Sequence, residues 1–388
     1  MSLPRLLYIG DVPIEASCHG SALLHRLLSD YPYDRLTIIE TARASDPQRR
    51  LPKVNYSFHP IGKARWLNTR FHPYAVVWFT QAGKRLAPKI AQSVNGVGFE
   101  SVLTVADGFG WLAAANIAGE RKVPLHLIVH DDLPTVAGVA PRFRKWFDGQ
   151  FAGVYRQAQS RLCVSPAMSR IYQQRYGQPA QVIYPSWAVD RPGFDAPPTV
   201  LFNNDKPFTI AFAGTVSYNG YVKALIALQK ALKSVEGRLL IFGSLTADVA
   251  RQIGLDAPGT KICGLVSSGE LLTRLRDEAD VLFVPMSFYE SDRDNMQMAF
   301  PSKLADYTAT GLPLLIYGPS YCSAVVWARD NPGVAEIVQA EADLGNAINC
   351  LASNPDRRIA LGKRALDVGR KYFTHDQAQR VFHSAISV

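Results

Sequence analysis

Residues Val281 to Tyr317 read VLFVPMSFYESDRDNMQMAFPSKLADYTATGLPLLIY, and this stretch predicts the fold of the chain. Its first part, Val281–Pro285, is apolar throughout, a pattern typical of a strand that is buried on both faces. Pro301 suits the first position of a helix, where a missing N–H costs nothing, and Gly311 supplies the left-handed residue that ends one. A second apolar run follows at Leu314–Tyr317. The order strand, helix, strand predicts two parallel strands joined by a right-handed crossover.

Two charged residues of the predicted helix indicate a ligand site. Lys303 lies in the first turn, where the helix dipole disfavours a cation by about 0.3–1 kcal/mol. A lysine beside free backbone N–H groups, at the carboxyl end of a strand, is suited to binding an anion. Asp306, one turn later, could accept two hydrogen bonds from a ribose diol. The alternative is a surface ion pair between Lys303 and Asp306, which their i,i+3 spacing allows.

Strand and helix patterns alternate through both halves of the sequence, which predicts doubly wound parallel sheets. Neither a GxGxxG fingerprint nor a Walker loop occurs, so the sequence does not indicate a dinucleotide-binding or P-loop enzyme. The runs that we interpret as strands are 6–10, 36–39, 101–105, 125–129, 161–165 and 181–185 in the first half, and 208–214, 239–243, 281–285 and 314–317 in the second.

Residues Phe300 to Leu315, FPSKLADYTATGLPLL, resemble the donor-site signature of GT-B glycosyltransferases of the GT4 type. The resemblance implies an α/β fold of two Rossmann-like, doubly wound domains that face a central cleft. In that family a helix start binds the donor diphosphate, and an acidic residue near Asp306 holds the ribose. The family often carries a Glu eight positions before that acidic residue. Met298 stands there in this chain, which is similar to the Pro-Ser-Lys variant of the family.

The resemblance also implies roles for residues elsewhere. His130 and Asp131 follow the predicted strand 125–129, and they are the candidate catalytic residues: the His would contact a sugar hydroxyl of the donor, and Asp131 or Asp132 would orient it or receive an acceptor hydroxyl. The alternative is that these residues only cap the next turn. Gly20 lies in a loop on the acceptor side. The expected donor-binding residues are Gly214, Thr215, Gly243, Leu265, Val266, Pro301, Ser302, Lys303 and Asp306.

The length of 388 residues favours two domains. We expect an acceptor domain at 1–190, a linker rich in Pro, Asn and Asp at 191–207, and a donor domain at 208–365. A final helix from about Pro355 would place residues 366–388 back on the N-terminal domain. No apolar run approaches the ~18 residues of a transmembrane helix. The five scattered Cys, without C-x-x-C spacing, indicate reduced thiols in a cytoplasm and no zinc site.

The formal net charge of +9 is unevenly placed. Residues 1–195 hold 23 Lys and Arg against 14 Asp and Glu, whereas the remainder holds 19 of each. Basic residues interleaved with aromatic ones are typical of a surface that binds anionic lipid or acidic glycan. The alternative is a merely basic, solvated surface. The predicted membrane or acceptor patch consists of Arg49, Arg50, Lys53, Lys63, Arg65, Trp66 and Arg70.

We therefore expect a retaining, hexosyltransferase-type glycosyltransferase that moves a sugar from a nucleotide-sugar donor to a glycan or lipid-linked acceptor. Cell-surface polysaccharide or glycoconjugate synthesis is the expected setting, in the cytoplasm or at the inner face of its membrane. The resemblance implies no metal ion and no cofactor besides the donor, and we expect no nucleic-acid partner. A nucleotide-sugar epimerase and a catalytically silent nucleotide-sugar-binding protein remain as alternatives. The D-x-D spacing at Asp292–Asp294 is interpreted as a loop. No motif encodes the sugar, the base or the acceptor.

Overall fold

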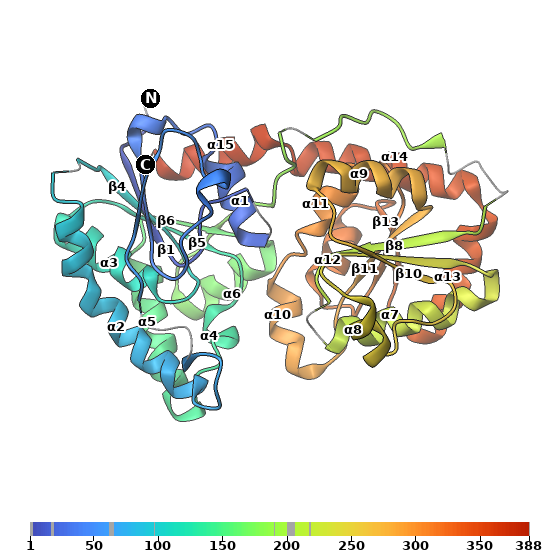
Figure 1. Ribbon diagram of the computed structural model, residues 1–388, viewed down its shortest axis with the longest axis horizontal. Helices are drawn as coiled ribbons and strands as arrows, with labels where there is room; N and C mark the ends of the chain where they lie inside the picture. Colours follow the sequence, from blue (N-terminus) through green and yellow to red (C-terminus); the bar gives the residue numbers. More distant parts are fainter. Residues whose placement is uncertain are drawn as a thin grey trace. The chain divides into compact units, whose positions relative to one another are not determined.

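The computed structural model describes residues 3–16, 19–61, 66–96, 98–189, 191–199, 206–216 and 219–387. Its contacts divide the chain into two compact units, coloured mainly blue to green and yellow to red in Figure 1. The N-terminal unit contains Met1–Ser186 together with His375–Val388, and the C-terminal unit contains Trp187–Thr374. Within the described residues, no helix is both long and apolar enough to cross a bilayer.

The N-terminal unit is built on a seven-stranded parallel sheet with the order β3-β2-β1-β4-β5-β6-β7. Because the order reverses direction between β1 and β4, these two strands flank the topological switch point, where ligands bind in open α/β sheets. The strands are β1 Leu6–Gly10, β2 Leu36–Glu40, β3 Asn55–Phe58, β4 Ser101–Val105, β5 Leu125–Val129, β6 Ser160–Cys163 and β7 Gln181–Val182.

Helices cover both faces of this sheet (Figure 1). The first and the last helices of the chain, α1 and α15, share one core cluster with β1, β2 and β4. Helices α2, α3 and α5 lie on the other face. The bounds are α1 His19–Leu28, α2 His72–Ser93, α3 Gly110–Arg121, α4 Leu133–Val136, α5 Arg144–Gln157, α6 Pro166–Tyr176 and α15 His375–Ile386.

The C-terminal unit repeats the design with a six-stranded parallel sheet in the order β10-β9-β8-β11-β12-β13. Its strands are β8 Thr209–Ala213, β9 Arg238–Phe242, β10 Thr260–Gly264, β11 Val281–Pro285, β12 Leu314–Tyr317 and β13 Ala335–Val338. Its helices are α7 Asn219–Leu232, α8 Ala247–Gln252, α9 Ser268–Glu278, α10 Arg293–Met298, α11 Lys303–Thr308, α12 Ser323–Asp330, α13 Glu341–Ser353 and α14 Pro355–Tyr372.

The predicted strand, helix, strand unit is present, with a shorter helix than expected. Strands β11 and β12 are parallel neighbours, and every residue in both is buried. Helix α11 spans only Lys303–Thr308. Before it, the carbonyl of Pro301 accepts the N–H of Leu304 at 3.0 Å, and that of Ser302 accepts the N–H of Ala305 at 3.1 Å. These bonds between residues three apart form a tight turn, so Pro301 precedes the helix instead of starting it.

The final helix also differs from the expected one. The single helix predicted from about Pro355 is two helices, α14 and α15, separated at Phe373–Thr374. Helix α14 belongs to the C-terminal unit and α15 to the N-terminal unit. Phe373 is fully buried and packs against the rings of Phe300 and Trp327, which fixes the place where the first of the two helices ends.

Candidate functional site

Three neighbouring strands of the C-terminal sheet lead into a glycine: Gly214 directly follows β8, Gly243 directly follows β9, and Gly264 is the last residue of β10. Backbone bonds tie these ends together, since Gly214 donates to the carbonyl of Phe242 and Gly243 to that of Gly264, both at 2.9 Å. A Cβ on Gly243 would lie 2.3 Å from the carbonyl oxygen of Gly214, and all three glycines have positive φ. A side chain would collide at Gly243 and would be strained by the positive φ at Gly214 and Gly264, so this edge of the sheet is bare backbone that a ligand can approach closely.

Lys303 provides a cation at this edge. Its Nζ lies 5.1 Å from the ring centroids of both Phe212 and Tyr221, and 3.7 Å from where a Cβ on Gly214 would stand. No hydrogen bond or ion pair joins its Nζ to another described residue, so the surface pair with Asp306 does not form. Burial lowers the pKa of Lys303 to about 8. A partly desolvated ammonium without a counter-charge is suited to binding an anion.

Tyr307 holds Lys303 in place. The Tyr307 ring is buried, and its hydroxyl accepts the N–H of Ala213 at 2.6 Å and lies 3.2 Å from the carbonyl of the same residue. These contacts join α11 directly to the last residue of β8. The position of the Lys303 ammonium beside Gly214 is therefore set by packing within the unit and not by a flexible loop.

Asp306 lies on another side of the same helix. Its charge acts on Arg191, whose pKa is lowered mainly by burial and secondly by Arg370, while Asp195 and Asp306 oppose that shift. Arg191 stacks 4.0 Å from the Trp187 ring centroid, and the Trp187 indole donates to the carbonyl of Ala305 at 2.7 Å. The contact of Asp306 with a ribose stays a prediction.

Exposed apolar side chains stand near the glycine-ended strands. Leu265, directly after β10, is 78% exposed, and Val266 is partly exposed. Phe288 and Tyr289, in the loop after β11, are 40% and 42% exposed, and the Nζ of Lys223 lies 5.7 Å from the Tyr289 ring centroid. Such groups offer a flat apolar surface to a planar ring. Phe288 and Tyr289 lie among polar and charged residues in the sequence, so no local pattern marks them as site residues.

In the N-terminal unit, the structure brings His130 and Gly20 together, although Gly20 lies in helix α1 and not in a loop as predicted. His130 follows β5, and a Cβ on Gly20 would lie 3.6 Å from its Nδ1. Burial lowers the pKa of His130 to about 4, so the imidazole is neutral at pH 7. No hydrogen bond links its ring to another described residue. A neutral ring of this kind can donate one hydrogen bond and accept another, as contact with a sugar hydroxyl requires.

The two aspartates after His130 have different environments. Asp132 is fully buried and accepts hydrogen bonds from Thr135 at 2.6 Å, Tyr172 at 2.9 Å and Arg175 at 3.0 Å, so its role is structural. Asp131 is exposed, and its pKa is raised by desolvation and by the charges of Asp107 and Asp132. Of the two, only Asp131 is available to a substrate.

Asp11 and Asp107, which the sequence reasoning did not select, occupy the switch point. Asp11 follows β1 and accepts the N–H groups of Phe109 at 2.7 Å and Gly110 at 2.9 Å, as well as the Thr41 hydroxyl. A Cβ on Gly108 would lie 1.7 Å from a carboxylate oxygen of Asp11, so the loop after β4 wraps tightly around this side chain. Desolvation raises the pKa of Asp11 to about 6 and also raises that of the exposed Asp107.

The strand ends of the N-terminal unit therefore present carboxylates: Asp107 and Asp131 at the surface, with Asp11 behind them. Within the described residues, no three His, Cys, Asp or Glu side chains gather closely enough to hold a metal ion. The arrangement provides hydrogen-bond acceptors for hydroxyl groups.

The predicted basic patch is divided in the structure. Arg49 pairs with Asp46, Arg50 pairs with Glu40 and stacks on Tyr56, and Lys53 lies over Tyr33, so these three cations are engaged beside β2 and β3. Lys63 and Arg65 lie outside the described residues. Trp66, 49% exposed, and Arg70, over Phe71, stand instead just before α2.

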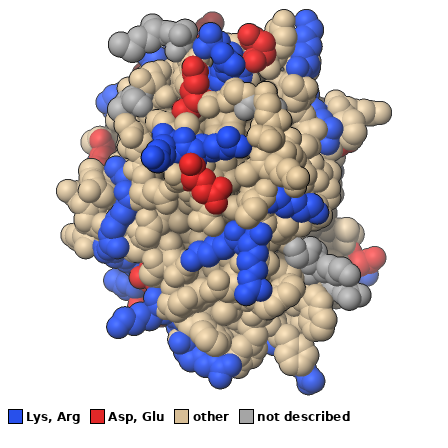
Figure 2. Space-filling model, turned by 90° about the vertical axis from the view of Figure 1, so that its left-hand side faces the viewer, with Lys and Arg blue, Asp and Glu red and all other residues tan. Residues whose placement is uncertain are grey.

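Exposed aromatic residues continue along the start of α2. Phe71, Tyr74 and Trp78 are 48%, 49% and 64% exposed, and Arg142 lies 5.0 Å from the Tyr74 ring centroid. We call Arg70, Phe71, Tyr74, Trp78 and Arg142 the α2 surface. Figure 2 shows the side of the molecule to the left in Figure 1, where Lys and Arg are widely spread and acidic residues are fewer.

Substitution of the two neighbouring aspartates should separate structure from function. Asp132→Ala leaves the Tyr172 hydroxyl and the Arg175 guanidinium without their acceptor, and we expect a loss of about 2–4 kcal/mol in the free energy of unfolding. Asp131→Ala removes an exposed carboxylate and should change stability by less than about 0.5 kcal/mol. Urea denaturation measures both. Equal destabilisation by the two substitutions would contradict the assignment.

Comparison with known proteins supports the fold. No protein-family model and no curated protein matches the sequence. Among solved structures, HepE of Anabaena in complex with UDP and glucose is 13% identical to this chain. The alignment covers 99% of each of the two chains, and the TM-score is 0.68. Sucrose-phosphate synthase of Thermosynechococcus elongatus is 14% identical over 98% of this chain and 97% of that one, with a TM-score of 0.66. WaaG, a glycosyltransferase involved in lipopolysaccharide biosynthesis, is 12% identical over 98% and 99%, with a TM-score of 0.64. The expected fold class is confirmed: the chain has the GT-B fold of these glycosyltransferases, with two parallel-sheet α/β domains.

Proposed function

We propose that this protein is a glycosyltransferase that moves a sugar from a UDP-sugar to a glycan or lipid-linked acceptor. The observation that carries the proposal is the ammonium of Lys303, which pairs with no described carboxylate and lies beside the bare backbone of Gly214, at the carboxyl end of β8. UDP as the nucleotide is supported by the similar structures, since HepE was solved with UDP and with UDP-glucose.

In this proposal the C-terminal unit holds the nucleotide. Lys303 and the backbone at Gly214 and Thr215 contact the diphosphate, because a cation beside free backbone N–H groups complements its charge. Asp306 holds the ribose. The uracil lies near Leu265 and Val266, where exposed apolar groups and backbone atoms are available to a planar base.

The N-terminal unit supplies the groups for the acceptor and for the transferred sugar. The neutral His130 contacts a sugar hydroxyl, and Asp131 accepts a hydrogen bond from a hydroxyl of the acceptor. The bond between the anomeric carbon and the phosphate oxygen breaks, and the acceptor oxygen bonds to the same face of that carbon. The acceptor proton passes to the leaving phosphate, whose charge Lys303 stabilises. The reaction therefore retains the anomeric configuration and needs no metal ion.

The acceptor must suit two surfaces of opposite charge. The exposed carboxylates Asp107 and Asp131 disfavour an anionic group and favour hydroxyls at the strand ends. The α2 surface combines arginines with exposed aromatic rings, a composition typical of proteins that rest on anionic membranes. We infer that the acceptor is a neutral sugar on an anionic, lipid-linked carrier, and that the α2 surface lies at the membrane.

A turnover assay tests the proposed activity. The protein, given UDP-glucose, UDP-galactose or UDP-N-acetylglucosamine with a panel of oligosaccharide acceptors, should release UDP in step with product, also in excess EDTA, and NMR should show a retained anomeric configuration. His130→Ala should lower the rate about 10²–10³-fold without lowering the melting temperature, since the ring makes no structural hydrogen bond to a described residue.

The other outcomes of this assay separate the alternatives. A change in the donor sugar without acceptor would indicate an epimerase. Binding of UDP-sugars without any turnover would indicate a silent binding protein. An inverted product, or activity lost in EDTA and restored by Mg²⁺, would contradict the proposed mechanism.

Lys303 should make UDP binding depend on pH. Since its pKa is about 8, the free protein carries this charge at pH 7 and loses it as the pH rises through 8. Affinity for UDP should therefore fall above pH 8, by up to tenfold per pH unit, and should stay nearly flat in Lys303→Ala. At pH 7 the substitution should weaken UDP about 10–100-fold, and uridine far less.

Isothermal titration calorimetry at pH 7 and pH 9 measures these affinities. Lys230→Ala, which removes an exposed cation from α7 of the same unit, is the matched control and should behave like the wild type. If Lys303→Ala weakens uridine and UDP equally, the ammonium does not contact the diphosphate.

The α2 surface predicts binding to anionic vesicles. Sedimentation with phosphatidylserine vesicles should recover the protein at low salt, less at high salt because exposed charges are screened, and little with phosphatidylcholine alone. Trp78→Ser and Arg142→Glu should each weaken binding. Val249→Ser and Arg251→Glu, exposed positions on α8 of the C-terminal unit, are the controls. Equal recovery with both vesicle types at low salt would contradict the membrane inference and favour a soluble acceptor.

A further inference from the structure

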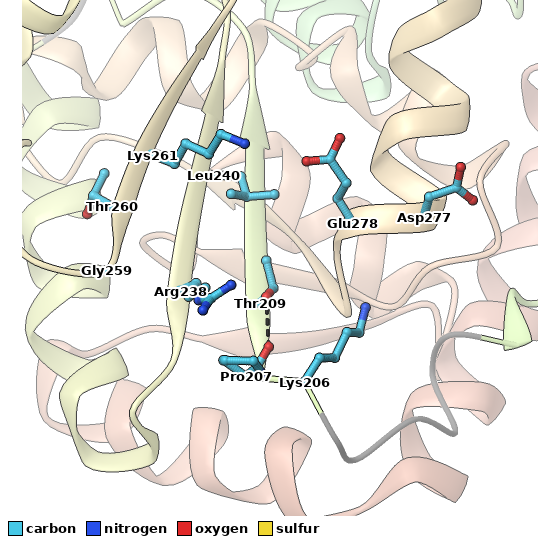
Figure 3. Close-up of a pocket in the computed structure, with 10 residues that line it drawn as sticks. All are labelled: Lys206, Pro207, Thr209, Arg238, Leu240, Gly259, Thr260, Lys261, Asp277 and Glu278. Carbon is cyan, nitrogen blue, oxygen red and sulfur yellow. Dashed lines mark hydrogen bonds between the residues drawn. The ribbon is translucent and has the colours of Figure 1, made fainter.

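A pocket of about 410 Å³ opens at the amino-terminal edge of the C-terminal sheet. It lies where β8, β9 and β10 begin and where α9 ends (Figure 3). The glycines proposed to approach the donor are at the other ends of these strands. Five residues of strand separate the two edges by about 16 Å. The pocket is therefore distinct from the proposed donor site, and its volume is in the range of pockets that bind small molecules.

Three cations from different segments surround this pocket. Lys206 comes from the segment before β8, Arg238 begins β9, and Lys261 lies on β10. In Figure 3 the side chain of Lys206 rises from below toward the α9 side, that of Arg238 lies at the left, and that of Lys261 lies above them. Attraction for an anion is the expected consequence of such an arrangement.

These cations have little compensation within the unit. The side chains of Arg238 and Lys261 form no hydrogen bond or ion pair with another described residue. The Nζ of Lys206 is buried and makes no hydrogen bond to a described residue, and it forms an ion pair with a carboxylate oxygen of Asp280 at 3.9 Å. The other oxygen of Asp280 accepts the N–H of Thr209 at 2.8 Å. Because Asp280 also accepts this backbone hydrogen bond, it offsets the charge of Lys206 only in part.

The remaining walls indicate what else the ligand must carry. Leu240 forms an apolar floor in the middle of the pocket. Glu278 and Asp277 stand on the α9 side; Glu278 is held by Arg274 at 2.6 Å, which offsets its charge but leaves carboxylate oxygen available to a donor. The Thr260 hydroxyl accepts from Gln229 at 2.7 Å and can still donate its own hydrogen. The pocket thus combines cations with the hydrogen-bond acceptors at the end of α9.

We propose that this pocket binds a small phosphorylated polyol, such as a sugar phosphate. The phosphate is held by Arg238 and Lys261, the buried charge of Lys206 adds to the attraction, and the hydroxyl groups donate to the carboxylates of α9. This ligand is not the substrate of the proposed transfer, because its site is at the opposite edge of the sheet, so the inference does not rest on the proposed function.

Calorimetric titration with ribose 5-phosphate tests the assignment, with inorganic phosphate and ribose as separate probes. Ribose 5-phosphate should bind more tightly than phosphate, and ribose weakly or not at all, because the pocket recognises both the anion and the hydroxyl groups. The double variant Arg238→Gln, Lys261→Gln should weaken ribose 5-phosphate at least tenfold. Two control proteins should bind it like the wild type: Lys230→Gln with Arg251→Gln, which removes two other exposed cations from the unit, and Lys303→Ala, which alters the donor edge.

The following outcomes would contradict the proposal. If the wild type does not bind ribose 5-phosphate, or if the Arg238 and Lys261 variant binds it as tightly, the pocket assignment is wrong. If only Lys303→Ala loses it, the compound binds at the donor edge and the proposal fails. If gluconate, a carboxylate of similar size, binds more tightly than ribose 5-phosphate, the anion recognised is a carboxylate and not a phosphate.

Discussion

The close approach of two backbones, at Gly214 and Gly243, is the constraint on which the C-terminal site depends. A single added carbon at Gly243 would meet the carbonyl oxygen of Gly214 at 2.3 Å, so β8 and β9 can end together only without side chains. This bare edge leaves room for the ammonium of Lys303, which Tyr307 fixes through its bonds to Ala213. Removing water from that ammonium lowers its pKa and increases its attraction for a phosphate.

Positive and negative side chains occupy different parts of the N-terminal unit. Counting residues by halves places the excess of positive charge in residues 1–195, yet the strand ends of the N-terminal unit carry Asp11, Asp107 and Asp131. The arginines and exposed rings of the α2 surface belong to an outer helical layer instead. Net charge is therefore a poor guide to the polarity of a site, because a site is set by the few side chains at the strand ends and not by the average of its domain.

Local sequence patterns predicted the features that depend on neighbouring residues in the chain, but not those that depend on distant residues. The buried strands β11 and β12 were predicted because continuous apolar runs need no distant partner to be recognised. The predicted length of α11 was wrong. The turn at Pro301 is held by hydrogen bonds between residues three apart, but its sequence resembles that of a helix start. Asp131 and Asp132 could not be told apart, because the burial of Asp132 depends on Tyr172 and Arg175, about forty residues later. The role of Asp11 was missed for the same reason: the backbone N–H groups from which it accepts hydrogen bonds are almost a hundred positions away.

The core of the N-terminal unit is complete only when helix α15, at the end of the chain, has been made. Phe382 is fully buried in the cluster that contains Leu6 and Tyr8, His375 lies 2.5 Å from Asp30, and Gln379 donates to the carbonyl of Leu27 at 2.9 Å. A ribosome making 5–20 residues per second needs about 10–40 s for residues 187–374, which come between. Throughout that interval the nascent N-terminal sheet exposes the apolar surface that α15 later covers. Chaperones that bind such surfaces would therefore find their target in the half of the chain that is made first.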